Sequence, residues 1–419
     1  MESTDAGGMR GNVYFTLDAL TPERLSWLTE LMKFYCARLH PESLQHHPLV
    51  PTPPFTFFLS GDAAYSLIDR QCAPFWEILF RLPPFQCMFD MTALRQRGIS
   101  PEPFRMKNPH QVLTRESVVD GQPGAFWDSL LEELCQSAPE SIGVLAHASP
   151  HMHHASGTLP GLLSAAVEKN ISPEFYGYLD GVHCAHRDQR TPEEEPVGEL
   201  LNGIYSAAAM KGLSPQFFIC DRSATKRGYS TFSDGKGRII SSCTLPPFKI
   251  RSLEEISARF RKKNQVISSS SFSIRVPAAA RIPHVDTRRQ NHSPPLVVLA
   301  SCSPYGSEMT AGAIAFALAC AHQGILTRVV FIEDGVYTVW GRHGIVEGGP
   351  LLNLQETIEI TSDSGIIEYY ALIPSLKLRG VATSGSMKGI FPINAGELAR
   401  LILAPPPNTE SDLQRVLLM

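Results

Sequence analysis

Short apolar runs alternate with longer segments of helical periodicity along the chain, and the same order of segments occurs three times. Runs of four to eight apolar residues are typical of buried strands, and apolar residues three and four apart are typical of helices. The strand-like runs cover residues 12–17, 55–59 and 87–90, then 142–146, 175–179 and 216–220, and finally 296–300, 328–333 and 366–372. Strands that alternate with helices favour parallel α/β units.

Three copies of one pattern fix the fold of all three together. We therefore predict an α/β protein of three domains, each a mostly parallel sheet flanked by helices on both faces. The predicted boundaries are 10–135 for the first repeat and 138–262 for the second, with a flexible linker over 263–294 and the third repeat over 295–405. The linker prediction rests on a run of serines from Ser268 and on the segment from Arg288 to Pro295, which are polar and low in complexity.

Corresponding residues recur at the ends of the predicted strands. Asp62, Asp180 and Asp334 follow the second strand of each copy. An Arg-Gly pair closes each copy, with the glycine at 98, 228 and 380. The residue eight positions before that glycine is Asp90 in the first copy, Cys220 in the second and Leu372 in the third, while Cys87 lies three positions too early.

Cys220 is the strongest candidate for chemistry. The buried strand that precedes it ends at the thiol, and residues 223–227 favour a short helix that Gly228 terminates. A helix N-terminus and the basic residues Arg222, Lys226 and Arg227 stabilise a thiolate, so we predict a depressed pKa and a nucleophilic Cys220. The alternative is a small buried hydrophobe, one of nine scattered cysteines.

Histidines gather after two strands of the second copy. His151, His153 and His154 follow its first strand, and His183, Cys184 and His186 follow its second. Both loops and Cys220 are predicted to lie at the carboxyl edge of one parallel sheet, where ligand sites form. Three interpretations stay open: a solvated histidine-rich loop, groups that support a thiolate, or a site for Zn²⁺ or another transition metal.

Length and charge narrow the class of protein. The 419 residues suggest three domains, and a net charge of −4 gives no basic surface for nucleic acid. Neither a signal peptide nor an apolar stretch long enough for a membrane span is apparent, so we expect a cytoplasmic protein without a membrane partner. An odd number of cysteines without a C-x-x-C pair predicts neither a disulfide framework nor a zinc knuckle.

The Asp-Gly-Val turns at 180–182 and 334–336, together with the segment from Cys220 to Gly228, resemble the DsrE/DsrF/TusBCD family of sulfur-relay proteins. The resemblance covers most of the chain in three copies and is weakest in the first. It implies that Cys220 carries sulfane sulfur as a persulfide, with Asp180, His183, Arg222, Lys226 and Arg227 as supporting residues. Only the second copy has a cysteine at the family's position, so the other two resemble the structural members of the family.

The resemblance also implies partners and an assembly. A sulfurtransferase of this kind needs a sulfur-donor protein and a sulfur-acceptor protein, and we expect no cofactor. A metal ion bound by the histidine cluster stays open as an alternative. Relatives form rings of single α/β subunits, so three copies in one chain are expected to make a monomeric pseudo-trimer or a homodimer of two. The competing hypothesis is a non-catalytic binding or assembly module with a metal or small ligand at the histidine-rich edge of the second repeat.

Overall fold

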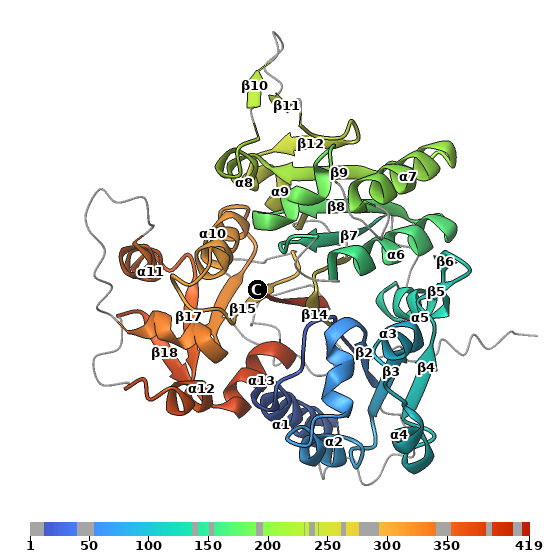
Figure 1. Ribbon diagram of the computed structural model, residues 1–419. Helices are drawn as coiled ribbons and strands as arrows, with labels where there is room; N and C mark the ends of the chain where they lie inside the picture. Colours follow the sequence, from blue (N-terminus) through green and yellow to red (C-terminus); the bar gives the residue numbers. More distant parts are fainter. Residues whose placement is uncertain are drawn as a thin grey trace, which may run out of the picture.

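The computed structural model describes residues 12–39, 54–135, 141–150, 155–189, 196–229, 231–233, 239–241, 243–260, 265–275, 293–340, 353–382, 388–404 and 413–419. Parallel strands flanked by helices form two large sheets, one of ten strands and one of five (Figure 1). We call residues 12–134 unit 1, residues 141–260 unit 2 and residues 296–403 unit 3. No helix in the described ranges has both the length and the apolar character needed to cross a membrane.

Unit 1 begins with strand, helix, strand and a 3-10 turn, and it closes with helix α5. Its strands β1 to β4 pair in parallel, as the alternation of strands and helices predicts. Its elements are β1 Asn12–Thr16, α1 Pro22–Leu39, β2 Phe55–Leu59, η2 Gly61–Leu67, α2 Ala73–Leu79, β3 Phe85–Asp90, α3 Met91–Gln96, α4 Glu102–Lys107, β4 Val112–Arg115, β5 Val118–Val119, β6 Gln122–Pro123 and α5 Ala125–Leu134.

Unit 2 has the same order and builds the five-stranded sheet β12-β9-β8-β7-β13, in which every pair of neighbours is parallel. A small hairpin, β10–β11, is inserted after its third strand. Its elements are β7 Ser141–Ala146, α6 Ala155–Glu168, β8 Ser172–Gly177, η3 Leu179–Ala185, α7 Val197–Met210, β9 Gln216–Cys220, α8 Asp221–Lys226, β10 Thr231–Ser233, β11 Ile239–Ser241, β12 Phe248–Arg251 and α9 Leu253–Phe260.

Unit 3 again pairs its four strands in parallel. Its first helix, α10, is rich in alanine and packs on β15 and β16. The elements are β15 Leu296–Ala300, α10 Met309–His322, β16 Thr327–Phe331, η5 Glu333–Val339, α11 Leu354–Asp363, β17 Glu368–Leu372, α12 Ile373–Leu378, β18 Ile390–Ile393 and α13 Ala395–Leu403.

Three further strands join the units. β13 (Gln265–Ile267) lies beside β7 of unit 2, whereas β14 (Ser270–Arg275) pairs antiparallel with β1 of unit 1. β19 (Leu413–Leu418) fills the place between β14 and β15, so the sheets of units 1 and 3 become one sheet of ten strands in the order β18-β17-β16-β15-β19-β14-β1-β2-β3-β4. The C-terminal residue lies near the centre of the molecule (Figure 1).

The prediction of a flexible linker over 263–294 is wrong for its described first part, residues 265–275. These residues are strands, and Ser268 to Ser271 are buried. Their hydroxyls have partners inside the protein, for example Ser268 Oγ with the Ser270 carbonyl oxygen at 2.7 Å and Ser270 Oγ with Tyr14 Oη at 3.2 Å. Residues 276–292 lie outside the described residues.

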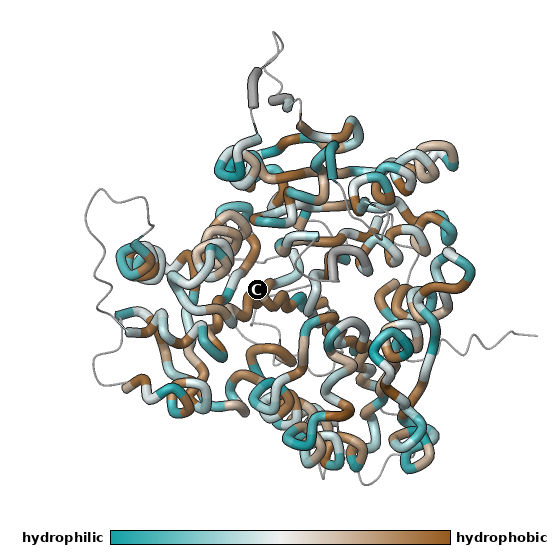
Figure 2. The backbone as a smooth tube through the Cα atoms, viewed as in Figure 1, coloured by the Kyte–Doolittle hydropathy of each residue, from teal (hydrophilic) through white to brown (hydrophobic). Residues whose placement is uncertain are grey.

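Each hydrophobic core belongs to two units at once. The first cluster combines one face of unit 1 with α13 and strands of unit 3, the second combines the other face of unit 1 with unit 2, and the third combines unit 2 with unit 3. Hydrophobic segments concentrate on the strands and on the inner sides of the helices (Figure 2). The three units are therefore packed against one another through apolar contacts rather than strung along the chain.

Candidate functional site

Three loops at the carboxyl ends of the parallel strands have the same backbone arrangement. The amide after the second strand donates to the last residue of the first strand in each unit: Ser60 to Thr16, Tyr178 to Ala146 and Ile332 to Ala300, at 3.1, 2.8 and 3.0 Å. The next residue has a positive φ in every case, 54° at Gly61, 48° at Leu179 and 50° at Glu333. An aspartate follows each of them.

These aspartates bind the arginines that the sequence places near the end of each copy. Arg97 contacts Asp62 at 2.8 Å, Arg227 contacts Asp180 at 2.6 Å, and Arg379 contacts Asp334 at 2.7 Å. The glycine after each arginine has a positive φ and ends the short helix that carries it. The aligned residues therefore occupy corresponding places in the three units.

Cys220 is the last residue of β9 and the N-cap of α8. Its side chain is only 1% exposed and belongs to the core that units 2 and 3 share. Nearby, the Tyr178 hydroxyl donates to the carbonyl oxygen of Gly312 on α10 at 2.9 Å, so the contact between the two units covers this part of the sheet. The thiol lies in the protein interior rather than at the surface.

The prediction of a depressed pKa for Cys220 is wrong. Burial raises the pKa of the thiol above its ordinary value, and hydrogen bonds with Ser223 oppose this effect without reversing it. Helix α8 has six residues, so the stabilisation that its N-terminus offers to a thiolate is small beside the cost of removing a thiolate from water.

The basic residues near Cys220 are engaged with carboxylates. Arg227 contacts Asp180 and also Glu308 of unit 3, the latter at 3.1 Å, and Lys226 contacts Glu308 at 3.2 Å. Burial works against ionisation of Glu308, but its two basic partners lower the pKa of this carboxyl overall. Arg222 is exposed, and its backbone N–H donates to Asp221.

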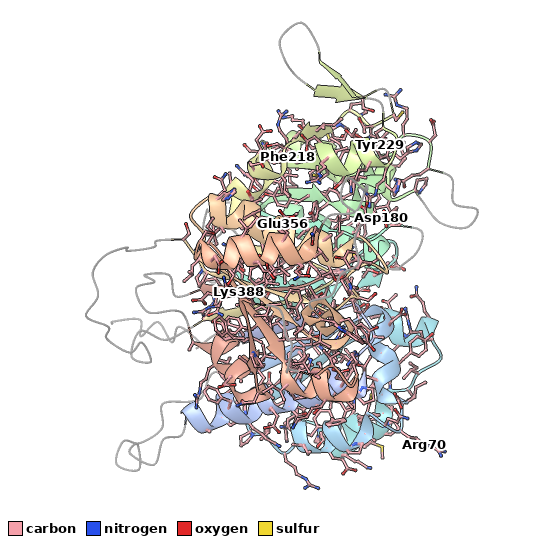
Figure 3. The ribbon with its side chains drawn as sticks, turned by 90° about the vertical axis from the view of Figure 1, so that its left-hand side faces the viewer. Arg70, Asp180, Phe218, Tyr229, Glu356 and Lys388 are labelled. Atoms are coloured by element: carbon pink, nitrogen blue, oxygen red, sulfur yellow. The ribbon has the colours of Figure 1, made fainter. Side chains whose placement is uncertain are left out.

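His183 and His186 face a cavity of about 410 Å³ that Cys243 and Tyr229 also line. His183 Nδ1 lies 2.9 Å from the Tyr229 hydroxyl, and His186 Nδ1 accepts the Asp188 amide at 3.1 Å. Asp180 and Tyr229 lie toward one side of unit 2 (Figure 3). The structure thus places two of the predicted histidines together, with Cys243 as a neighbour that the sequence pattern did not single out.

Of the other members of the predicted histidine cluster, Cys184 is described, and it does not line this cavity. Cys184 is fully buried in the core that units 1 and 2 share. His151, His153 and His154 lie outside the described residues. Among the described residues, no group of three or more histidine, cysteine, aspartate or glutamate side chains is arranged to hold a metal ion.

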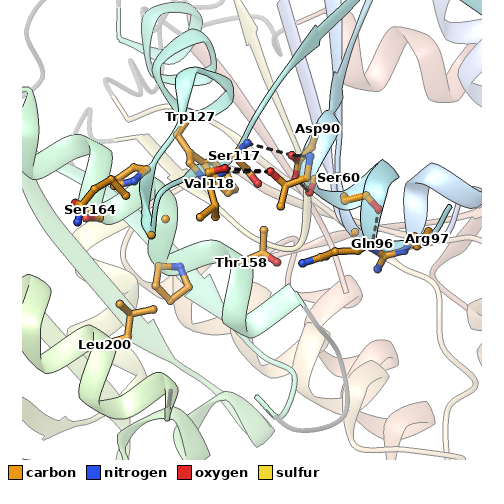
Figure 4. A pocket seen from close by; sticks show the side chains of 18 of the residues that line it. Ser60, Asp90, Gln96, Arg97, Ser117, Val118, Trp127, Thr158, Ser164 and Leu200 are labelled. Carbon is orange, nitrogen blue, oxygen red and sulfur yellow. Dashed lines mark hydrogen bonds between the residues drawn. The ribbon is translucent and has the colours of Figure 1, made fainter. Parts of the chain in front are cut away.

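A larger cavity, about 640 Å³, lies between unit 1 and unit 2 at the junction that corresponds to Cys220. Here the junction residue is Asp90, which is buried and caps α3. Its carboxylate accepts hydrogen bonds from the Ser60 hydroxyl at 2.5 Å and from the amides of Thr92 and Ser117 at 2.9 and 3.1 Å (Figure 4). The sequence analysis placed Asp90 at the position of Cys220 but predicted no site there, and that correspondence is the signal that could have led to this cavity.

Comparison with known proteins gives a local match. A model of the DsrE/DsrF-like family matches residues 295–404, a range that contains the whole of unit 3. Among solved structures, the ychN protein from E. coli is similar to 30% of this chain over 99% of its own length, with 23% sequence identity and a TM-score of 0.25. No curated protein matches the chain.

Proposed function

We propose, from the DsrE/DsrF-like match of residues 295–404 and from the three corresponding units, that this protein works in sulfur relay. In this proposal the chain is three fused DsrE-like units, and Cys220 carries the sulfur. The observation that supports Cys220 is its place. It is the cysteine among three corresponding strand-to-helix junctions, the other two being occupied by Asp90 and Leu372.

The proposed chemistry is an exchange between a thiolate and a persulfide. The Cys220 thiolate attacks the outer sulfur of a donor cysteine persulfide, a new S–S bond forms, and the donor thiolate leaves. An acceptor thiolate then attacks the outer sulfur on Cys220, and the Cys220 thiolate leaves. The sulfane sulfur changes partner twice with no net oxidation or reduction, so donor and acceptor proteins suffice and no cofactor is required.

Burial of the thiol determines how such a transfer would be controlled. A partner reaches Cys220 only when the contact between α8 and the start of α10 opens. Glu308 binds Lys226 and Arg227 across this contact at the surface. Glu308→Gln weakens both ion pairs and is expected to make Cys220 more accessible.

Mass spectrometry of peptides after treatment with glutathione persulfide tests the proposal. We expect the mass of one added sulfur atom on Cys220, more of it in Glu308→Gln, and none at this position in Cys220→Ser. Cys302→Ser is the matched control, because Cys302 lies in a loop at the same edge of unit 3. A Cys220 that stays unmodified in both the original protein and Glu308→Gln contradicts the proposal.

The second candidate is a non-catalytic binding or assembly module, and the buried thiol with its raised pKa favours it. In that case Cys220 is a core residue, and the cavity lined by His183 and His186 takes a small ligand. Persulfide on Cys302 or Cys243 but never on Cys220 would favour this second function.

We also propose that the chain is a pseudo-trimer, either as a monomer or as a homodimer. The three hydrophobic clusters support this arrangement, because each of them needs side chains from two units. Closing the ring within one chain makes association intramolecular. Light scattering that gives a stable homotrimer, or small-angle scattering from an extended string of domains, would contradict it.

A further inference from the structure

Two of the three contacts between units contain the same set of charged side chains. Between units 2 and 3, Arg227 uses Nε for Asp180 and a terminal nitrogen for Glu308 at 3.1 Å. Between units 3 and 1, Arg379 uses Nε for Asp334 at 2.7 Å and a terminal nitrogen for Glu23 at 2.9 Å. Each arginine thus joins an aspartate of its own unit to a glutamate of the next unit.

The contact between units 1 and 2 lacks the glutamate. Arg97 binds Asp62 through a terminal nitrogen at 2.8 Å and the Ala93 carbonyl oxygen through the other at 3.2 Å. The Arg97 side chain is only 9% exposed, so water does not readily reach its Nε. This buried Nε has no hydrogen-bond partner among the residues that the structure describes. The sequence contains no aspartate or glutamate from 147 to 167, the span that leads into α6 and forms all of it except Glu168, so the start of α6 has no carboxylate to offer Arg97.

Arg97 lines the cavity of about 640 Å³. Arg97 and Gln96 on unit 1 face Thr158 of α6 across this space (Figure 4). Tyr65 and Val118, which are 47% and 48% exposed, are among the apolar residues of the lining, and the Arg97 guanidinium lies over the Tyr65 ring at 5.5 Å from its centroid. Sites for small ligands usually combine apolar lining residues with a few polar or charged groups, such as the arginine here.

The charges of the cavity limit what it can hold. Asp62, Asp90 and Arg97 are the charged residues among the described ones that line it, so this described lining has one more carboxylate than cations. A simple anion would increase this excess, whereas a ligand that carries an ammonium group beside its carboxylate does not. We propose that this cavity binds an apolar α-amino acid, with the carboxylate on Arg97, the ammonium group toward Asp62 and the side chain against Tyr65 and Val118.

The other two contacts indicate how Arg97 would receive the carboxylate. When its guanidinium turns so that Nε binds Asp62, as Nε binds the aspartate in units 2 and 3, a terminal nitrogen becomes available to the ligand. The ligand carboxylate then takes the place that Glu308 and Glu23 hold elsewhere. This inference depends on the geometry of the three contacts and is independent of sulfur transfer.

Isothermal titration calorimetry of the full chain with L-leucine, L-methionine and L-phenylalanine tests the site. We expect saturable binding of at least one of them, and no binding of isopentylamine or isocaproate, which are leucine without its carboxylate and without its amino group. Failure of all three amino acids to bind overturns the proposal, and so does isocaproate that binds as tightly as leucine.

Variants then locate the site. Arg97→Gln removes the charged partner of the carboxylate and is expected to weaken binding about 10- to 100-fold. Thr158→Glu supplies the missing carboxylate from unit 2 and is expected to abolish binding while it raises the melting temperature. Arg379→Gln removes the corresponding arginine at the contact between units 3 and 1 and should leave the affinity for the amino acid unchanged. Equal affinity in Arg97→Gln and the original protein, with both folded by circular dichroism, overturns the assignment.

Discussion

The place of Cys220 in the sequence and its place in the folded protein lead to opposite expectations for the pKa of its thiol. The strand-to-helix junction favours a thiolate, but the packing of unit 3 over this junction removes the thiol from water. Desolvation is the larger effect, so the pKa is raised. A reactive Cys220 therefore requires a change in the contact between units 2 and 3.

Thiol alkylation at neutral pH measures this effect directly. Iodoacetamide should modify the partly exposed Cys36, Cys135, Cys243 and Cys302 before it modifies Cys220. In Glu308→Gln the rate at Cys220 should rise, whereas the rate at Cys320, a fully buried residue of α10, should not. Equal rates for Cys220 and Cys302 in the original protein would contradict the buried position.

The buried thiols should also make the free energy of unfolding depend on pH. Burial raises the pKa of Cys320 to about 12 and raises the pKa of Cys220. An unfolded thiol loses its proton near pH 8.5, so above this pH the unfolded chain binds fewer protons than the folded protein and folding stability falls as pH rises. Each such thiol contributes at most about 1.4 kcal/mol per pH unit in this range.

Urea denaturation between pH 7 and pH 10 gives the measurement. The free energy of unfolding should decrease above about pH 8.5, and Cys320→Ala should reduce the slope of that decrease although it lowers stability at pH 7. A free energy of unfolding that stays constant up to pH 10 would mean that ionisation of the buried thiols does not destabilise the protein at alkaline pH.

At the scale of elements, the Asp-Gly-Val turns have a steric reason for their glycine. A Cβ atom on Gly181 would lie 1.9 Å from the carbonyl oxygen of Ala146, and one on Gly335 would lie 2.0 Å from that of Ala300. The turn crosses directly over the end of the first strand, where only a hydrogen atom fits. This crossing also aims Asp180 and Asp334 at their arginines.

Gly181→Ala should therefore destabilise the protein by about 3 kcal/mol or more, because the strand end must move. Gly203→Ala is the matched control: Gly203 is exposed in α7 with free space around it, and alanine there should stabilise by about 0.5–1 kcal/mol. Thermal denaturation of both variants decides. Similar melting temperatures for the two would contradict the steric argument.

The order and parallel pairing of the strands were predictable because apolar runs of strand length alternate with helical segments. The recurrence of the aspartates and arginines was also visible in the sequence, whereas their pairing as salt bridges became apparent only in the structure. The strands β13 and β14 were not: Ser268 to Ser271 are polar in sequence, and their burial depends on partners such as Tyr14 that lie far away in the chain. The burial of Cys220 likewise depends on residues of unit 3, which lie far from it in the sequence.

At the scale of the whole molecule, β19 is the element that makes units 1 and 3 one sheet. It pairs with β15 in parallel and with β14 in antiparallel orientation, and its residues are buried. Without it, β14 and β15 would present unpaired edges in the middle of the protein.

Deletion of residues 413–419 should therefore separate the unfolding of unit 3 from that of unit 1. In the full chain we expect coincident unfolding curves from circular dichroism and from tryptophan fluorescence, which reports mainly unit 1 through Trp27, Trp76 and Trp127. In the deletion variant the two curves should diverge. Coincident curves at an unchanged midpoint would show that β19 does not couple the units.

The pairing of β1 with β14 also has a consequence for biosynthesis. β1 is made among the first residues of unit 1, but the strand that covers its free side follows roughly 250 residues later, after the whole of unit 2. At about 5–20 residues per second, the ribosome needs roughly 10–50 s to deliver it. During that interval the nascent chain exposes an unpaired edge that carries Val13, Tyr14 and Phe15, so we expect chaperones that bind extended apolar segments to act on this chain while it is still being translated.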